Sequence, residues 1–149
     1  MDFSATDWVN VGLTEAILAR EGPPLYVAAQ RGCVAAVKVM TAAGANLEVL
    51  GPNGMRPLHA AAQGGHAGIV GILLNAGCEV DPQDADGNTP LISAVLSGQS
   101  TTVEFLLAVG ANVNIARLDG LTACHLAQLP GTPMGIQELL ELGAEAQRQ

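Results

Sequence analysis

Residues 90–98 read PLISAVLSG, and closely similar segments occur on both sides at a constant spacing. PLYVAAQRG begins at residue 24, PLHAAAQGG at residue 57 and ACHLAQLPG at residue 123, so each segment starts 33 residues after the previous one. Two sets of glycines keep the same register: Gly32, Gly65, Gly98 and Gly131, and then Gly44, Gly77, Gly110 and Gly143. Three independent markers in one register indicate four repeated units.

Each unit has the pattern of two short helices. In the second unit Leu58, Ala61 and Ala62 have the i, i+3, i+4 spacing of an inward-facing helical stripe. Pro57 suits the first position of that helix, where a missing N–H is not needed. We expect a second helix to follow and to end at Gly77, because glycine readily adopts the positive φ that terminates helices. Its apolar residues are Ile69, Val70, Leu73 and Leu74.

The segments between the helices complete the unit. The stretch CEVDPQDADGN before residue 89 is extended in character and contains an Asp-Gly dipeptide, which predicts a hairpin-like turn. DADGNTPLISAVLSG followed by VEFLLAVGANVN resembles the ankyrin repeat, as does GPNGMRPLHAAAQGGHAGIVGILLNAG. The resemblance covers roughly residues 22–145. It implies an all-α solenoid of stacked helix-turn-helix units with β-hairpin-like turns, in which turn tips and first helices line a concave groove.

The sequence departs from the ankyrin pattern in places. The threonine that caps the first helix is replaced by Pro23 in the first unit and Arg56 in the second, so we expect no side-chain cap there. The fourth unit has Ala-Cys-His instead of Pro-Leu-His, and prolines at Pro130 and Pro133 interrupt it. We therefore expect an ankyrin repeat domain over 22–149 whose last unit is a C-terminal cap with a polar outer face: Gln137, Glu138 and Glu141.

Residues 1–21 precede the first unit and are expected to form an N-terminal capping segment. Leu13, Ile17 and Leu18 have helical spacing. Trp8 has two interpretations: it covers the open core of the first unit, or it is an exposed anchor for a partner.

Composition and charge exclude several classes of protein. The six Lys and Arg residues against fourteen Asp and Glu give a net charge of −8, without a basic stripe, which excludes a nucleic-acid binder that neutralises phosphates. The acidic balance favours a partner with basic flanks, although the charge can equally serve solubility. No apolar run approaches the length of a membrane span, and the N-terminus lacks the Lys or Arg of a signal peptide. Three cysteines at unrelated spacings suit a reducing compartment, so we expect a cytoplasmic or nuclear monomer.

The residues that usually carry catalysis fit structural roles. His59 and His125 occupy the same position two units apart, and helix layers roughly 8–10 Å thick would separate them by roughly 16–20 Å, too far to share a metal ion. The resemblance implies that such histidines, and His66, fix the turns between units. Cys124 and His125 are adjacent in a helix, so their side chains diverge by about 100°.

The remaining candidates for chemistry fail on spacing. The acidic run Glu79, Asp81, Asp84 and Asp86 lacks the spacing of a calcium loop, and we interpret it as turn residues, some of which cap the next helix. The single lysine, Lys38, lies in an expected helix with no phosphate-binding loop. We expect no catalytic residue, no metal and no cofactor.

Binding is therefore the function that we expect. The resemblance places partner-binding residues at turn tips and on the outward faces of the first helices: Asn53, Met55, Gln63, Asp86, Asn88, Leu96, Ser97, Asp119, Leu121 and Leu129. Met55, Leu96, Leu121 and Leu129 are large and apolar, which predicts an apolar strip with an acidic rim. The alternative for Leu121 and Leu129 is that they tighten the last unit.

Three functional hypotheses follow. The first is a non-catalytic protein-interaction module whose groove binds a protein or peptide. The second is a small ankyrin-type regulator that inhibits or assembles an enzyme. The third, a catalytic protein, has little support. The first two use the same groove, so the sequence does not separate them.

Overall fold

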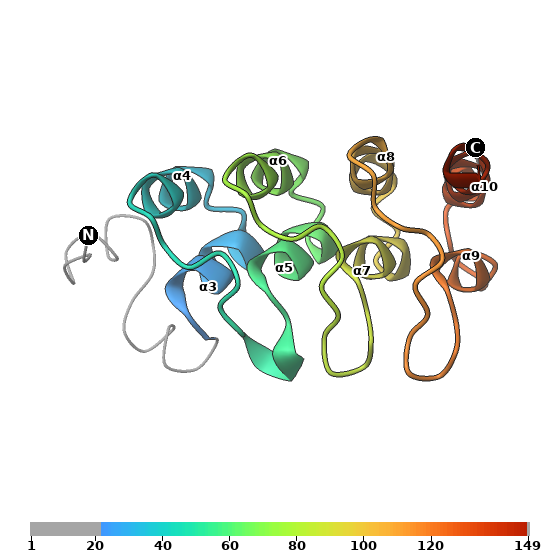
Figure 1. Cartoon of the computed structure of the whole chain (residues 1–149), viewed down its shortest axis with the longest axis horizontal. Helices are drawn as coiled ribbons and strands as arrows, with labels where there is room; N and C mark the ends of the chain where they lie inside the picture. The colour runs from blue at the N-terminus through green and yellow to red at the C-terminus, as the bar shows by residue number, and fades with distance from the viewer. Residues whose placement is uncertain (1–21, 149) are drawn as a thin grey trace.

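The computed structural model describes residues 22–148, and the N-terminal capping segment expected over 1–21 lies outside the described residues. The first helices of the four units form one row: α3 (Pro24–Arg31), α5 (Pro57–Gln63), α7 (Pro90–Leu96) and α9 (Ala123–Leu126). The second helices form another: α4 (Val34–Ala42), α6 (Ala67–Asn75), α8 (Ser100–Ala108) and α10 (Met134–Arg148). The two rows run side by side in Figure 1, with the connecting turns extending beyond the first row. The predicted all-α solenoid of stacked units is confirmed.

Local sequence sets where most helices begin and end. Prolines occupy the first turn of α3, α5 and α7, as predicted. The Thr89 hydroxyl accepts a hydrogen bond from the Ile92 amide at 3.2 Å and so caps α7. Pro23 and Arg56 make no such side-chain cap, as expected from their chemistry. At the other end of the unit, α6 stops before Gly77, whose φ of 103° reverses the chain.

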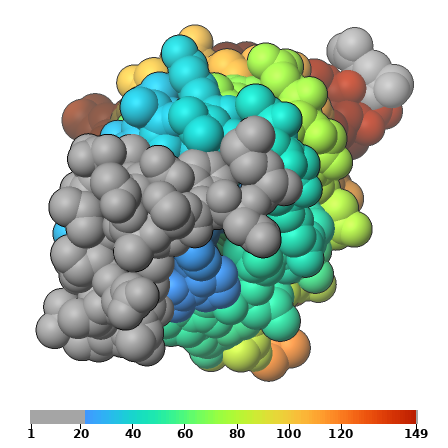
Figure 2. Space-filling model, turned by 90° about the vertical axis from the view of Figure 1, so that its left-hand side faces the viewer, coloured from blue at the N-terminus to red at the C-terminus, as the bar shows by residue number. Residues whose placement is uncertain are grey.

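The core is made of small aliphatic side chains from both rows. Figure 2, which looks along the stack, shows the later units lying behind α3 and α4. Because α5 packs against α3, α6 and α7, all of its residues except Gln63 are buried, rather than only the predicted stripe. Within residues 22–148 the buried polar side chains are few: His59, Thr89, Ser93 and Thr102. The stack therefore has one continuous apolar interior that runs through all units.

The fourth unit differs from the others at its end. Gly44, Gly77 and Gly110 have positive φ, but Gly143 lies inside α10, which continues to Arg148. The residues after Gly143 are mostly good helix formers, so they extend the helix instead of turning. A side chain at Gly143 would come within 2.9 Å of Leu107, so this glycine allows α10 to pack closely on α8.

The turns between units are hairpin-like, as predicted, although no strand forms in the described part of the chain. In each turn a backbone amide donates to a carbonyl four residues later: Gly51 to Met55 at 2.7 Å, Asp84 to Asn88 at 3.0 Å and Arg117 to Leu121 at 2.8 Å. The first turn also contains the short 3-10 helix η1 (Pro52–Gly54). Neighbouring turns are joined because Ala85 donates to the Asn53 carbonyl at 2.9 Å and Leu118 to that of Asp86 at 3.1 Å.

Candidate functional site

His59 links two units from a fully buried position. The Arg56 amide donates to His59 Nδ1 at 3.0 Å, so this nitrogen carries no proton. The neutral ring is therefore protonated at Nε2, which donates to the Asn88 carbonyl at 2.8 Å. Burial lowers the pKa of His59, and the Asn88 carbonyl opposes that shift only in part. His59 thus joins the base of the turn before α5, at Arg56, to the base of the turn before α7, at Asn88, as the resemblance implied.

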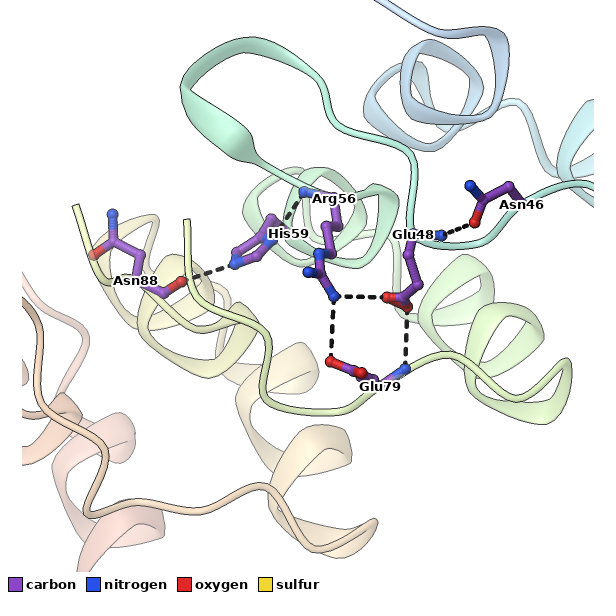
Figure 3. Close-up of polar contacts among 6 residues, drawn as sticks. All are labelled: Asn46, Glu48, Arg56, His59, Glu79 and Asn88. Atoms are coloured by element: carbon purple, nitrogen blue, oxygen red, sulfur yellow. Dashed lines mark hydrogen bonds and ion pairs between the residues drawn. The ribbon is translucent and has the colours of Figure 1, made fainter. Parts of the chain in front are cut away.

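An ionic network joins the same units on the outside of α5. One guanidinium nitrogen of Arg56 lies 3.0 Å from Glu48 and 3.2 Å from Glu79, and Glu48 also accepts the Glu79 amide at 3.2 Å. Figure 3 shows this arrangement, in which residues from three separate segments meet. Arg56 therefore replaces the missing helix cap with contacts between units.

Other hydrogen bonds that fix turns or join neighbouring units involve His66, Asp81 and Asp84. His66 contacts the Gln30 carbonyl at 3.2 Å, and Asp81 accepts the Asn112 amide at 3.2 Å. Asp84 accepts from the amides of Asp86 and Asn88, both at 2.9 Å. The turn interpretation of the acidic run is confirmed, but these acids cap no helix, because Thr89 does so in the third unit.

The cysteines and metal-binding residue types form no reactive cluster in the described part of the chain. Burial, with the charge of Glu48, raises the pKa of Cys78 to about 12, and burial also raises that of Cys124. The three cysteines form no disulfide and are half-buried. Within residues 22–148 no group of three or more His, Cys, Asp or Glu side chains could hold a metal ion.

The side of the first helices and turns contains a hollow of about 200 Å³ between the second and third units. We call it the first hollow. It is lined by Asn53, Met55, Gln63, Asp84, Asn88, Ser93, Leu96 and Ser97. Six of these were expected to bind a partner, and the structure brings those six together. Asp84 and Ser93 were not expected there: the sequence places Asp84 in a turn and Ser93 inside a helix, and neither position signals a shared hollow.

A second hollow, of about 370 Å³, lies between the third and fourth units. It is lined by Val95, Leu96, Ser97, Gly98, Leu126, Leu129, Pro130, Gly131, Thr132 and Pro133. Leu96 and Ser97 border both hollows, so Leu96, which is 47% exposed, separates them. Leu129 lines the second hollow and is 49% exposed.

The other expected residues lie at the turn tips, outside the two hollows. Asp86 accepts a hydrogen bond from the Asn53 amide group at 2.8 Å. Asp119 accepts the Leu121 amide at 3.1 Å and lies 3.4 Å from Arg117. Leu121 is 37% exposed, and the neighbouring Leu118, which sequence reasoning missed, is 80% exposed at the third tip. The third turn thus carries two exposed leucines, Leu118 and Leu121.

Comparison with known families agrees with this geometry. A family model for ankyrin repeats, describing three copies, matches residues 25–117 and again residues 82–149. These matches span most of the chain, so the protein belongs to the ankyrin repeat family. Ankyrin repeats are generally non-catalytic modules for protein–protein interaction. A search of curated proteins gave no match.

No helix within residues 22–148 is long and apolar enough to cross a lipid bilayer.

Proposed function

We propose that this chain is a non-catalytic interaction module that binds a partner protein or peptide through the groove formed by its turns and first helices. The observation that carries the proposal is the pair of hollows on either side of the exposed Leu96. A site of this kind takes protruding side chains from a partner, and the exposed leucines around it favour apolar ones.

The charge around the groove supports a partner with basic flanks. Asp84 and Asp86 lie on the second turn, and no Lys or Arg of the described residues forms an ion pair with either. Such uncompensated acids at the rim would orient a basic partner and accelerate its association. The proposed setting is the cytoplasm or the nucleus.

Affinity capture from host lysate tests the groove. Wild type is compared with the double variant Met55→Glu/Leu96→Glu, which places charge in both hollows. The matched control is Val39→Glu, an exposed apolar position on α4 in the other row of helices. All three proteins must first show the same circular dichroism spectrum and melting temperature.

A protein that is enriched by wild type and by Val39→Glu, but lost with the double variant, supports the proposal. Equal capture by all three proteins rejects the groove. Adding the purified chain to an activity assay of a captured enzyme then separates a simple interaction module from a regulator, because only a regulator changes that activity.

A further inference from the structure

The first hollow has two apolar walls of different origin. Met55 comes from the turn that precedes α5, and its sulfur accepts a hydrogen bond from the Tyr26 hydroxyl at 3.7 Å, which restrains the side chain. Leu96 is the last residue of α7 and stands half-exposed on the other side. A flexible aliphatic chain fits between two such walls, because long side chains bury their methylene groups along apolar surface.

Hydrogen-bond acceptors line the same hollow. The amide nitrogen of Asn88 donates to Asp84 Oδ2 at 3.1 Å, which fixes the orientation of that amide. The side-chain oxygen of Asn88, Oδ1, is buried and accepts no hydrogen bond in the described part of the chain. Ser93, which is buried, adds a hydroxyl. The residues that line the hollow thus carry a carboxylate, a hydroxyl and a buried amide oxygen that accepts no hydrogen bond from the described residues.

The negative charge of the hollow has no cationic partner within residues 22–148. Asp84 is stabilised by three N–H donors, two backbone amides and the Asn88 side chain, and none of them carries a charge. The nearest arginine along the chain, Arg56, contacts Glu48 and Glu79 instead. Arg117 contacts Asp119. A cation entering the hollow would therefore meet a carboxylate that forms no ion pair with the described residues.

Building on the proposed function, we infer that the first hollow is a receptor for one lysine side chain of the partner. Its volume of about 200 Å³ suits a single long side chain. An ammonium has three donors that can separate to reach three acceptors in different directions. A guanidinium instead pairs best with a carboxylate when both oxygens are available to accept two parallel hydrogen bonds. Both oxygens of Asp84 already accept hydrogen bonds, so this geometry favours lysine over arginine.

Oriented peptide libraries test this assignment on the full chain. Four libraries share randomised flanks and differ only in the fixed central residue: lysine, norleucine, arginine or acetyl-lysine. Norleucine keeps the aliphatic stem without the charge. We expect immobilised wild type to retain about tenfold more of the lysine library than of the norleucine library.

Four variants locate the effect. Asp84→Asn keeps an oxygen that can accept the turn amides, and we expect it to abolish the preference for lysine. Asp81→Asn is the matched control, because it removes the same charge three residues earlier in the chain, at a residue that does not line the hollow and that accepts the Asn112 amide, and it should keep the preference. Gln63→Lys changes an exposed lining residue, so it repels a partner lysine without disturbing the turn, and Gln63→Met is its neutral counterpart.

Each result supports or overturns the inference. Equal retention of the lysine and norleucine libraries by wild type overturns it, while leaving the groove intact if both libraries are lost with Met55→Glu/Leu96→Glu. Equal retention of arginine and lysine overturns the choice of lysine. Equal loss with Asp84→Asn and Asp81→Asn assigns the effect to general acidity and overturns the receptor. If no library is retained at all, the groove does not bind peptides, and the proposed peptide-binding function fails with the inference.

Discussion

The second and third units begin with different residues at the same position, Arg56 and Thr89. Thr89 acts within its own unit, where its hydroxyl caps α7. Arg56 leaves α5 without a side-chain cap and reaches Glu48 and Glu79, so it acts between units. The comparison teaches that one position in a repeat can stabilise either its own helix or the stacking of its neighbours, depending on the length of the side chain.

Histidines three residues after this position occur in the second and fourth units, and they show the same contrast. His59 is buried between the second and third units and bonds to both. His125, in the fourth unit, is exposed and bonds within the described residues only to Thr122 of its own unit. Equivalent residues should therefore make unequal contributions to stability.

The largest effect is expected from His59→Ala. The substitution removes two buried hydrogen bonds and leaves a cavity, so the free energy of unfolding should fall by about 2–4 kcal/mol. His125→Ala, the matched change at an exposed site, should cost less than about 1 kcal/mol. Urea unfolding followed by circular dichroism measures both. Similar losses for the two variants would contradict the contrast.

The same histidine should make stability depend on pH. Burial lowers the pKa of His59 below its ordinary value of 6.5. As the pH falls below 6.5, His59 therefore binds a proton in the unfolded chain before it does so in the folded chain. The stabilisation is present above about pH 6.5 and is lost as the pH falls toward the lowered pKa. Urea midpoints measured across this range should decline less steeply for His59→Ala than for wild type. Parallel declines would show that other groups govern the acid limb.

Smaller effects are expected from the capping positions. Thr89→Ala removes the cap of α7 and should cost about 1 kcal/mol. Arg56→Thr exchanges partly exposed ion pairs, worth at most about 1 kcal/mol, for a new cap of similar value, so stability should change little. Unfolding at low and high salt separates the contributions, because wild type should lose more stability than Arg56→Thr as salt rises. Equal salt sensitivity of the two proteins would contradict this assignment.

The 33-residue register made most of the fold predictable. Prolines and glycines mark helix ends by their own backbone preferences, which neighbouring units do not alter. The fourth unit departs from the register, because Gly143 lies inside a helix. At that glycine the packing of α10 against Leu107 and the helix-forming residues that follow outweigh the tendency to turn.

The groove was predictable in part, for a related reason. Repeat positions identify which side chains face the groove, so Met55 and Leu96 could be named. Asp84 and Ser93 were missed because they line a hollow that forms only when two units stack. Leu118 was missed because the resemblance gave no reason to single out that position of the turn. Features that depend on how units meet require the three-dimensional arrangement.

The hydrogen bonds between neighbouring turn tips have a consequence for amide exchange. The amides of Ala85 and Leu118 belong to exposed residues, yet each donates to the carbonyl of the preceding turn. They are therefore protected only while neighbouring units are in register. Their deuterium uptake would report the opening of a single junction, Ala85 for the second and third units and Leu118 for the third and fourth, before the helices themselves unfold.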